Sequence, residues 1–144
     1  MMNMENSVNM IDLANVDAHL RAHDITPTQQ RVDIAKILFA RPQHLSAEHV
    51  LDRVNQETAL VSKATVYNTL GLFARKGLVR EVIIEPGKVF YDSNVQPHHH
   101  FYNIDTGDLI DIGADEVSVQ NISALPEGMQ SVGVDVIVRI SQLK

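Results

Sequence analysis

The chain has 144 residues, 44% of them apolar, which is enough for one packed domain or two small ones. Its net charge of −6 argues against loose binding to nucleic acid, although residues 1–94 are nearly neutral and leave room for a local basic stripe. The chain has no cysteine, which excludes disulfides, thiolate metal sites and thiol catalysis. It also has no apolar run near the roughly 20 residues that span a bilayer, so we expect a cytoplasmic protein without a membrane partner.

The N-terminal half has the apolar periodicity of helices. Helices are predicted over residues 11–24, 28–41, 46–56 and 62–76, and the first rests only on the spacing of Ile11, Val16 and Leu20. Thr28, Ser46 and Ser62 precede the other three, where a hydroxyl can accept a hydrogen bond from the first turn. Gly77 suits the left-handed residue that ends the last helix.

A hairpin follows these helices. The segment VREVIIEPGKVFYD predicts two short strands around an EPGK turn. Helices followed by a hairpin are the order of a winged helix. We therefore expect residues 1–92 to form a winged-helix DNA-binding domain and residues 93–97 to form a hinge linker.

Residues 98–144 predict a small α/β domain. HHHFYNI and LIDI read as a second hairpin around a DTGD turn, and residues 115–124 read as a short helix. The last segment alternates, which predicts a strand with one buried face made of Val132, Val134, Val136, Val138 and Ile140. Because so small a domain cannot easily bury its own core, we expect it to be the dimerisation domain of a homodimer. The fold class is α+β.

The helix over residues 62–76 is the candidate for the DNA major groove. Lysine can meet phosphate, tyrosine and threonine can contact phosphate or thymine methyl groups, and asparagine can read adenine. The candidate contacts are Lys63, Thr65, Tyr67 and Asn68, with Arg31 from the second helix. The alternative is an ordinary polar helix face, because this order of elements is not unique to DNA-binding proteins.

Three adjacent histidines begin the second hairpin. A purification tag belongs at a terminus and this run is internal, but a His-rich surface loop is an alternative. In a strand, His98 and His100 point to one side and His99 to the other, so the pair can chelate a divalent ion. Further ligands must come from earlier histidines or from carboxylates, of which Glu85 and Asp111 are the best placed. The rival interpretations are a His/carboxylate metalloenzyme and a metal-free dimeric protein with structural histidines.

These segments together resemble one family. HLSAEHV, ATVYNTLGLFARKGLV, EPGK and HHHFYNIDTGDLIDI are similar to the ferric uptake regulator (Fur) family over roughly residues 20–140. The resemblance implies a metal-dependent, homodimeric transcription factor that binds a double-stranded DNA operator. It also implies a regulatory metal site made of His44, Glu85, His98 and His100, with Asp111 as a ligand in some members. His99 falls where members have a residue of a second metal site.

The segment VFYDSNVQPHHHFY is most similar to the iron response regulator (Irr) branch, which implies an effector of Fe, Mn or Zn, or else haem. Three features depart from the family. The paired cysteines of a structural zinc site are absent, and their first pair would fall at Asn103 and Thr106. Thr26 stands where members carry a basic residue, and no Cys-Pro haem motif is present. We expect an iron- or haem-linked transcriptional regulator.

Overall fold

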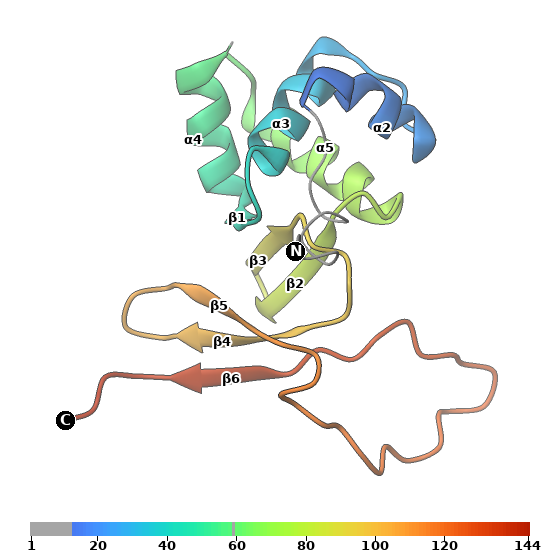
Figure 1. The fold of residues 1–144 in the computed structure, drawn as a ribbon, viewed down its shortest axis with the longest axis vertical. Helices are drawn as coiled ribbons and strands as arrows, with labels where there is room; N and C mark the ends of the chain where they lie inside the picture. Colours follow the sequence, from blue (N-terminus) through green and yellow to red (C-terminus); the bar gives the residue numbers. More distant parts are fainter. Residues whose placement is uncertain (1–12, 59) are drawn as a thin grey trace, which may run out of the picture. The chain divides into compact units, whose positions relative to one another are not determined.

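The computed structural model describes residues 13–58 and 60–144. The chain divides into two compact units, Met1–Val95 and Gln96–Lys144 (Figure 1). The first carries the helices and one small sheet, and the second carries a separate sheet. Ile11, which the sequence assigned to the first helix, lies outside the described residues.

The helices of the first unit form where the sequence predicts them. They are α2 Val16–Ala22 after the short turn η1 Leu13–Asn15, α3 Gln29–Phe39, α4 Ala47–Glu57 and α5 Lys63–Arg75. Each of the three predicted caps accepts a hydrogen bond from the first turn: Thr28 from Arg31, Ser46 from His49 and Ser62 from Thr65. Gly77 follows α5 with φ +76°, as expected for the left-handed residue after a helix.

One apolar core joins these helices. Buried side chains come from every helix of the unit, among them Leu20 of α2, Leu38 of α3, Val50 of α4 and Phe73 of α5. The stripes at helical spacing therefore face inward as predicted, and most of the unit's stability comes from this packing.

The sheet of the first unit has three strands in the order β1-β3-β2. The predicted hairpin consists of β2 Arg80–Glu85 and β3 Lys88–Asp92, with Gly87 at φ +82° in its turn. The third strand, β1 His44–Ser46, was not predicted, and it pairs antiparallel with β3 so that His44 lies opposite Asp92. Helices with this small sheet make a winged helix.

The second unit is a three-stranded sheet in the order β5-β4-β6. The predicted hairpin is confirmed as β4 His99–Asn103 and β5 Leu109–Ile112, and β6 Ile137–Ile140 runs parallel to β4. The helix predicted over residues 115–124 is wrong, because that segment is irregular. Asn121 has φ +62°, which a right-handed helix cannot accommodate.

The final strand is also shorter than predicted. Only residues 137–140 pair with β4, and Gly133, with φ +155°, precedes them in irregular chain. None of the five alternating residues is buried, and Val132 is 98% exposed. The reason is that no helix of this unit covers its sheet. Among the described residues, no helix has the length and apolarity needed to cross a membrane.

Candidate metal site

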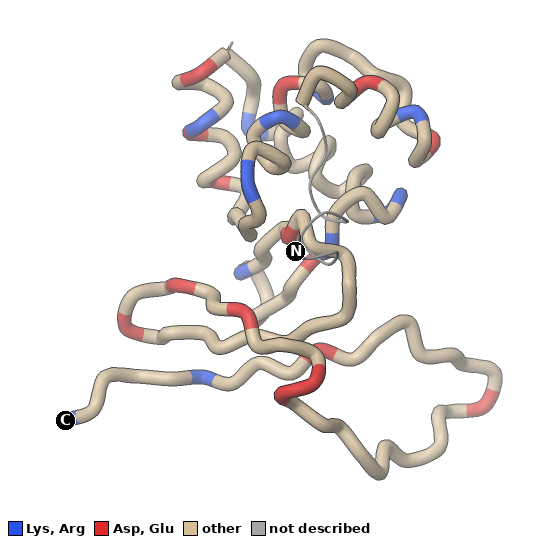
Figure 2. The backbone as a smooth tube through the Cα atoms, in the orientation of Figure 1, with Lys and Arg blue, Asp and Glu red and all other residues tan. Residues whose placement is uncertain are grey.

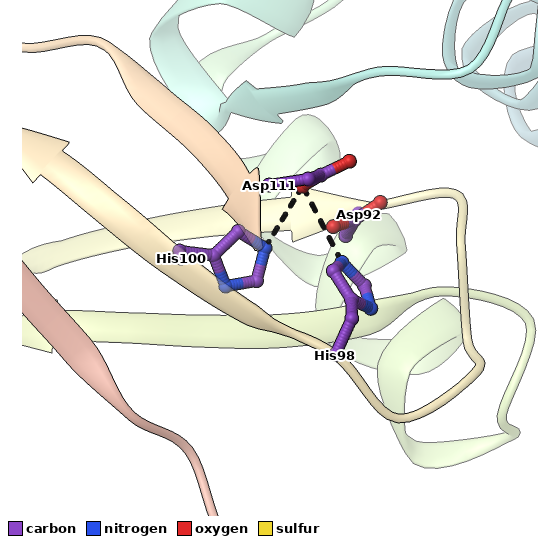
Figure 3. Close-up of side chains that lie close together, drawn as sticks. All are labelled: Asp92, His98, His100 and Asp111. Atoms are coloured by element: carbon purple, nitrogen blue, oxygen red, sulfur yellow. Dashed lines mark ion pairs between the residues drawn. The ribbon is translucent and has the colours of Figure 1, made fainter. Parts of the chain in front are cut away.

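Three side chains of the second unit converge at the start of its hairpin. The rings of His98 and His100 lie on one side of β4, with centroids 4.6 Å apart, as the alternation predicts. Asp111 stands opposite His100 in β5. Its Oδ1 lies 3.5 Å from Nε2 of His98 and 3.3 Å from Nε2 of His100 (Figure 3). Both imidazoles are buried, whereas the Asp111 side chain is 56% exposed and opens this cluster to solvent.

The backbone orients one of these rings. Nδ1 of His98 lies 2.7 Å from the carbonyl oxygen of Gln96. Because a carbonyl oxygen only accepts, the proton sits on Nδ1, and neutral His98 keeps its lone pair on Nε2, the nitrogen nearest Asp111. Metal-ligating histidines commonly donate their other nitrogen to such a carbonyl.

The distances suit a small metal ion better than direct hydrogen bonds. Separations of 3.3 and 3.5 Å exceed the ordinary length of an N–H···O bond, about 2.7–3.2 Å. Two ligand atoms each about 2.0–2.1 Å from a tetrahedral ion lie roughly 3.3–3.4 Å apart. Oδ1 of Asp111 is therefore spaced from each imidazole nitrogen like two ligands of one such ion, and the ligand atoms of His98, His100 and Asp111 all lie within 4.8 Å of one another.

His99 lies apart from this cluster. Its Nδ1 accepts a hydrogen bond of 3.0 Å from the backbone N–H of Val136, which ties the chain before β6 to β4. Within residues 13–58 and 60–144, no group of three or more potential metal ligands includes His99. Among the described residues the His99 side chain thus links β4 to the chain before β6, and its role in a second metal site stays a prediction.

The predicted ligands of the first unit lie at two ends of its sheet. His44 is opposite Asp92, at the end of β3 that leads out of the unit. Glu85 is opposite Lys88 at the hairpin turn, exposed, with an ion-pair distance of 3.7 Å to that lysine. Lys88 and Asp92 are four residues apart on β3, or about 13 Å. The structure therefore does not bring Glu85 to His44.

Asp92 was passed over by the sequence reasoning. It is 2% exposed, its Oδ1 accepts the backbone N–H of Asn94 at 2.9 Å, and it is drawn in Figure 3. Carboxylates are seldom this buried without a partner or a metal. The available signal was an acidic residue ending an apolar strand, VFYD, shortly before the histidines.

The predicted DNA-contacting residues lie on the outside of the first unit. Lys63, Tyr67 and Asn68 are exposed on α5, and Thr65 is half-buried beside its cap. Arg31 of α3 donates a hydrogen bond of 2.9 Å to the carbonyl oxygen of Thr26. Figure 2 shows that nearly all Lys and Arg lie in the first unit, whereas the charges of the second are mostly acidic.

Comparison with known proteins decides the family. Residues 22–139 match the ferric uptake regulator family. The chain belongs to that family. It is 31% identical over 108 residues, 72% of this chain and 74% of the relative, to the ferric uptake regulation protein of Synechococcus elongatus. It is 29% identical over 94 residues to the peroxide-responsive repressor PerR of Staphylococcus aureus, which covers 65% of this chain and 64% of that protein.

A solved structure confirms the fold class. The ferric uptake regulator from Pseudomonas aeruginosa with manganese superposes with a TM-score of 0.67 at 25% identity, over 89% of this chain and 98% of the other. The α+β class predicted from the sequence is thereby confirmed. As a Fur-family member, the protein is a metal-responsive, DNA-binding transcriptional regulator and not an enzyme.

Proposed function

We propose that a divalent ion bound by His98, His100 and Asp111 is the effector that controls operator binding by the winged-helix unit. The observation that supports this most directly is the convergence of two buried imidazole nitrogens on one carboxylate oxygen, at 3.5 and 3.3 Å. The exposed side of Asp111 gives an ion access from solvent. A metal held there is a cofactor of regulation rather than of catalysis.

Three donors leave coordination positions to fill, and we propose that the first unit supplies them. His44 and Asp92 are paired residues on neighbouring strands, so their side chains share a face of the sheet. Asp92 also precedes His98 by only six residues. In this proposal Asp92 takes the role that the resemblance gave to Glu85, which is exposed beside Lys88.

The donor atoms restrict the metal. Imidazole with carboxylate suits Fe(II), Mn(II) and Zn(II), and the absence of cysteine removes the thiolate ligands that favour softer ions. The relative from Pseudomonas aeruginosa was solved with manganese. Zinc binds such sites more tightly than manganese or iron in vitro, so we propose that metal supply decides between them in the cell.

Haem is an alternative effector, and its support is the resemblance of the segment VFYDSNVQPHHHFY to the iron response regulator branch. The same two imidazoles, His98 and His100, are the candidate axial ligands. Haem titration followed by the absorbance of the bound porphyrin tests it. Binding that persists in the double variant His98→Ala/His100→Ala would remove this region as the haem site.

For the DNA contact, we propose that α5 enters the major groove of the operator. Lys63, Tyr67 and Asn68 are exposed on that helix, and Thr65 lies in its first turn. Arg31 is the proposed phosphate contact from α3. Because phosphate contacts carry no sequence information, Asn68 and Tyr67 are the residues to which we assign base recognition.

The second unit is the proposed homodimer interface. Ile110, Phe101 and Val138 are neighbours across the three strands, on the side of the sheet opposite His100. Ile110 is 47% and Val138 is 39% exposed. An apolar row of this kind in water is stabilised when a second copy covers it.

The mechanism follows from where the ligands come in the chain. An ion bound by residues of both units limits their relative motion about the junction at Val95. Two recognition helices of a dimer must lie about one helical turn of DNA apart, or a multiple of it. Fixing that separation before binding raises operator affinity, typically about 5- to 150-fold for such coupling. By linkage, the operator must tighten metal binding by the same factor.

Metal titration of purified protein tests the ligand set. The double variant His98→Ala/His100→Ala should lose the high-affinity site, while His49→Ala, an exposed histidine of α4, should keep it. Asp92→Asn should weaken binding and Glu85→Gln should not. If Glu85→Gln weakened metal binding and Asp92→Asn did not, Glu85 would be the ligand and Asp92 would be rejected.

Operator titration tests the function itself. A duplex selected from a random-sequence pool by the wild-type protein is titrated at several metal concentrations, with chelator, and at about pH 7.5 and 5.5. Protons compete with metal for imidazole, so acid should release the ion and weaken DNA binding together. If operator affinity is the same with added metal and with chelator, this site is not a sensor.

A further inference from the structure

A network of three side chains links two helices on the surface of the first unit. The hydroxyl of Tyr67 on α5 donates a hydrogen bond to the carboxylate of Glu48, which lies nineteen residues earlier in the first turn of α4. Nζ of Lys63 lies 5.6 Å from the centre of the same tyrosine ring, within the range of a cation–π contact. The ring is thus held at its hydroxyl by one helix and at its face by another residue of its own helix.

Charge strengthens this network. The hydrogen bond from Tyr67 and a backbone hydrogen bond hold the pKa of Glu48 below its ordinary value. The charges of Lys63 and His49 lower that pKa further, whereas partial burial raises it. The same bond, together with burial and the carboxylate charge, raises the pKa of Tyr67. At neutral pH the carboxylate is ionised and the phenol keeps its proton, so the bond is charge-assisted.

The carboxylate is an unexpected group at this position. Tyr67 is 38% exposed and Glu48 is exposed, so neither is needed for the core. On a surface that meets phosphates, an anion lowers affinity for every DNA sequence. A carboxylate there needs a compensating benefit, and fixing an aromatic side chain that would otherwise sample several rotamers in water is such a benefit.

We infer that Glu48 is a positioning residue that raises the operator specificity of this protein by holding the Tyr67 ring in one orientation. This inference rests on the proposal that α5 contacts DNA. Contacts to a thymine methyl group or a base edge require a defined ring position, whereas phosphate contacts tolerate movement. Glu48 therefore lowers affinity for all DNA slightly, and it improves the discrimination between the operator and other sequences.

A double-mutant cycle in DNA binding tests this. The measured quantity is the ratio of affinities for the selected duplex and for an unrelated duplex, in wild type, Glu48→Ala, Tyr67→Phe and the double variant. Glu48→Ala should strengthen binding to the unrelated duplex and lower the ratio about three- to tenfold. In the Tyr67→Phe background, which keeps the ring and removes the hydroxyl, Glu48→Ala should leave the ratio unchanged.

Glu57→Ala is the matched control, since it removes the same charge at the exposed far end of the same helix. It should change both affinities together and leave the ratio as it is. An equal loss of the ratio from Glu48→Ala in both backgrounds would overturn the inference, because Glu48 would then act without Tyr67. An unchanged ratio in the single variant would do the same. If the random pool gives no enriched sequence at all, the proposed DNA-binding function fails instead.

Discussion

Replacing Asp111 by asparagine should lower metal affinity and leave the stability of the metal-free protein nearly unchanged. The substitution keeps the size and one carbonyl oxygen of the side chain and removes its charge. Without metal, Oδ1 of Asp111 lies 3.5 and 3.3 Å from Nε2 of His98 and His100, and the Asp111 side chain is 56% exposed. Water screens a carboxylate that is more than half exposed, so such a contact is worth about 0–1 kcal/mol and the metal-free variant should melt within a few degrees of wild type.

With metal the two proteins should differ strongly. Loss of a residue that only supports a ligand costs about 10- to 100-fold in metal affinity, so loss of the ligand's own charge should cost about 100-fold. At a metal concentration of about 1,000 times the wild-type Kd, binding stabilises wild type by about 4.1 kcal/mol. The variant, at about ten times its own Kd, gains only about 1.4 kcal/mol. At roughly 4 °C per kcal/mol, the metal-induced rise in Tm should be about 16 °C for wild type and about 6 °C for Asp111→Asn.

Differential scanning calorimetry with chelator and with Zn(II) or Mn(II) measures both rises. Asp108→Asn is the control, because this carboxylate is exposed in the turn of the same hairpin and is not among the grouped ligands. It should keep the full wild-type rise. The reasoning is refuted if Asp111→Asn also keeps it, since the carboxylate would then not bind the ion.

Three further outcomes are expected. Tyr67→Phe should weaken binding to the selected duplex more than to unrelated DNA, whereas Lys63→Ala should weaken both about equally and reduce the salt dependence, as measured by fluorescence anisotropy. Burial first, and the neighbouring His23 second, lower the pKa of His19, so the unfolded chain binds that proton more readily than the folded one. Stability from this group is present above the ordinary histidine pKa of about 6.5 and is lost as pH falls below it; denaturant titration of metal-free protein should show that loss, and His19→Phe should reduce it. Light scattering should find a dimer at micromolar concentration, and Val138→Glu should give monomer or insoluble protein.

The sequence by itself determined the local elements. The caps Thr28, Ser46 and Ser62 and the left-handed Gly77 act within one turn of a helix, so their residue types predict where helices begin and end. The same is true of His98 and His100, because side chains of a strand alternate regardless of the rest of the fold. Asp111 could be assigned to the partner strand because a short hairpin sets its own register.

Other features depended on residues far apart in the chain. The strand at His44 is only three residues long, and it exists because β3, more than forty residues later, provides its hydrogen bonds. That pairing puts His44 beside Asp92 rather than Glu85, a distinction that depends on register and not on residue type. The bond between Glu48 and Tyr67 likewise needs α4 and α5 packed together.

The errors have the same cause. Residues 115–124, which Pro126 and Gly128 bound, are predicted as a helix and are irregular, and the alternation over residues 132–140 predicts a longer strand than Ile137–Ile140. Periodicity predicts that such a segment is stabilised when something covers its apolar side, and no helix of the second unit covers it. Only the tertiary structure decided which side chains are buried. Burial requires another element that packs on the apolar side of a segment, and the pattern of that segment's own residues does not say whether such an element exists.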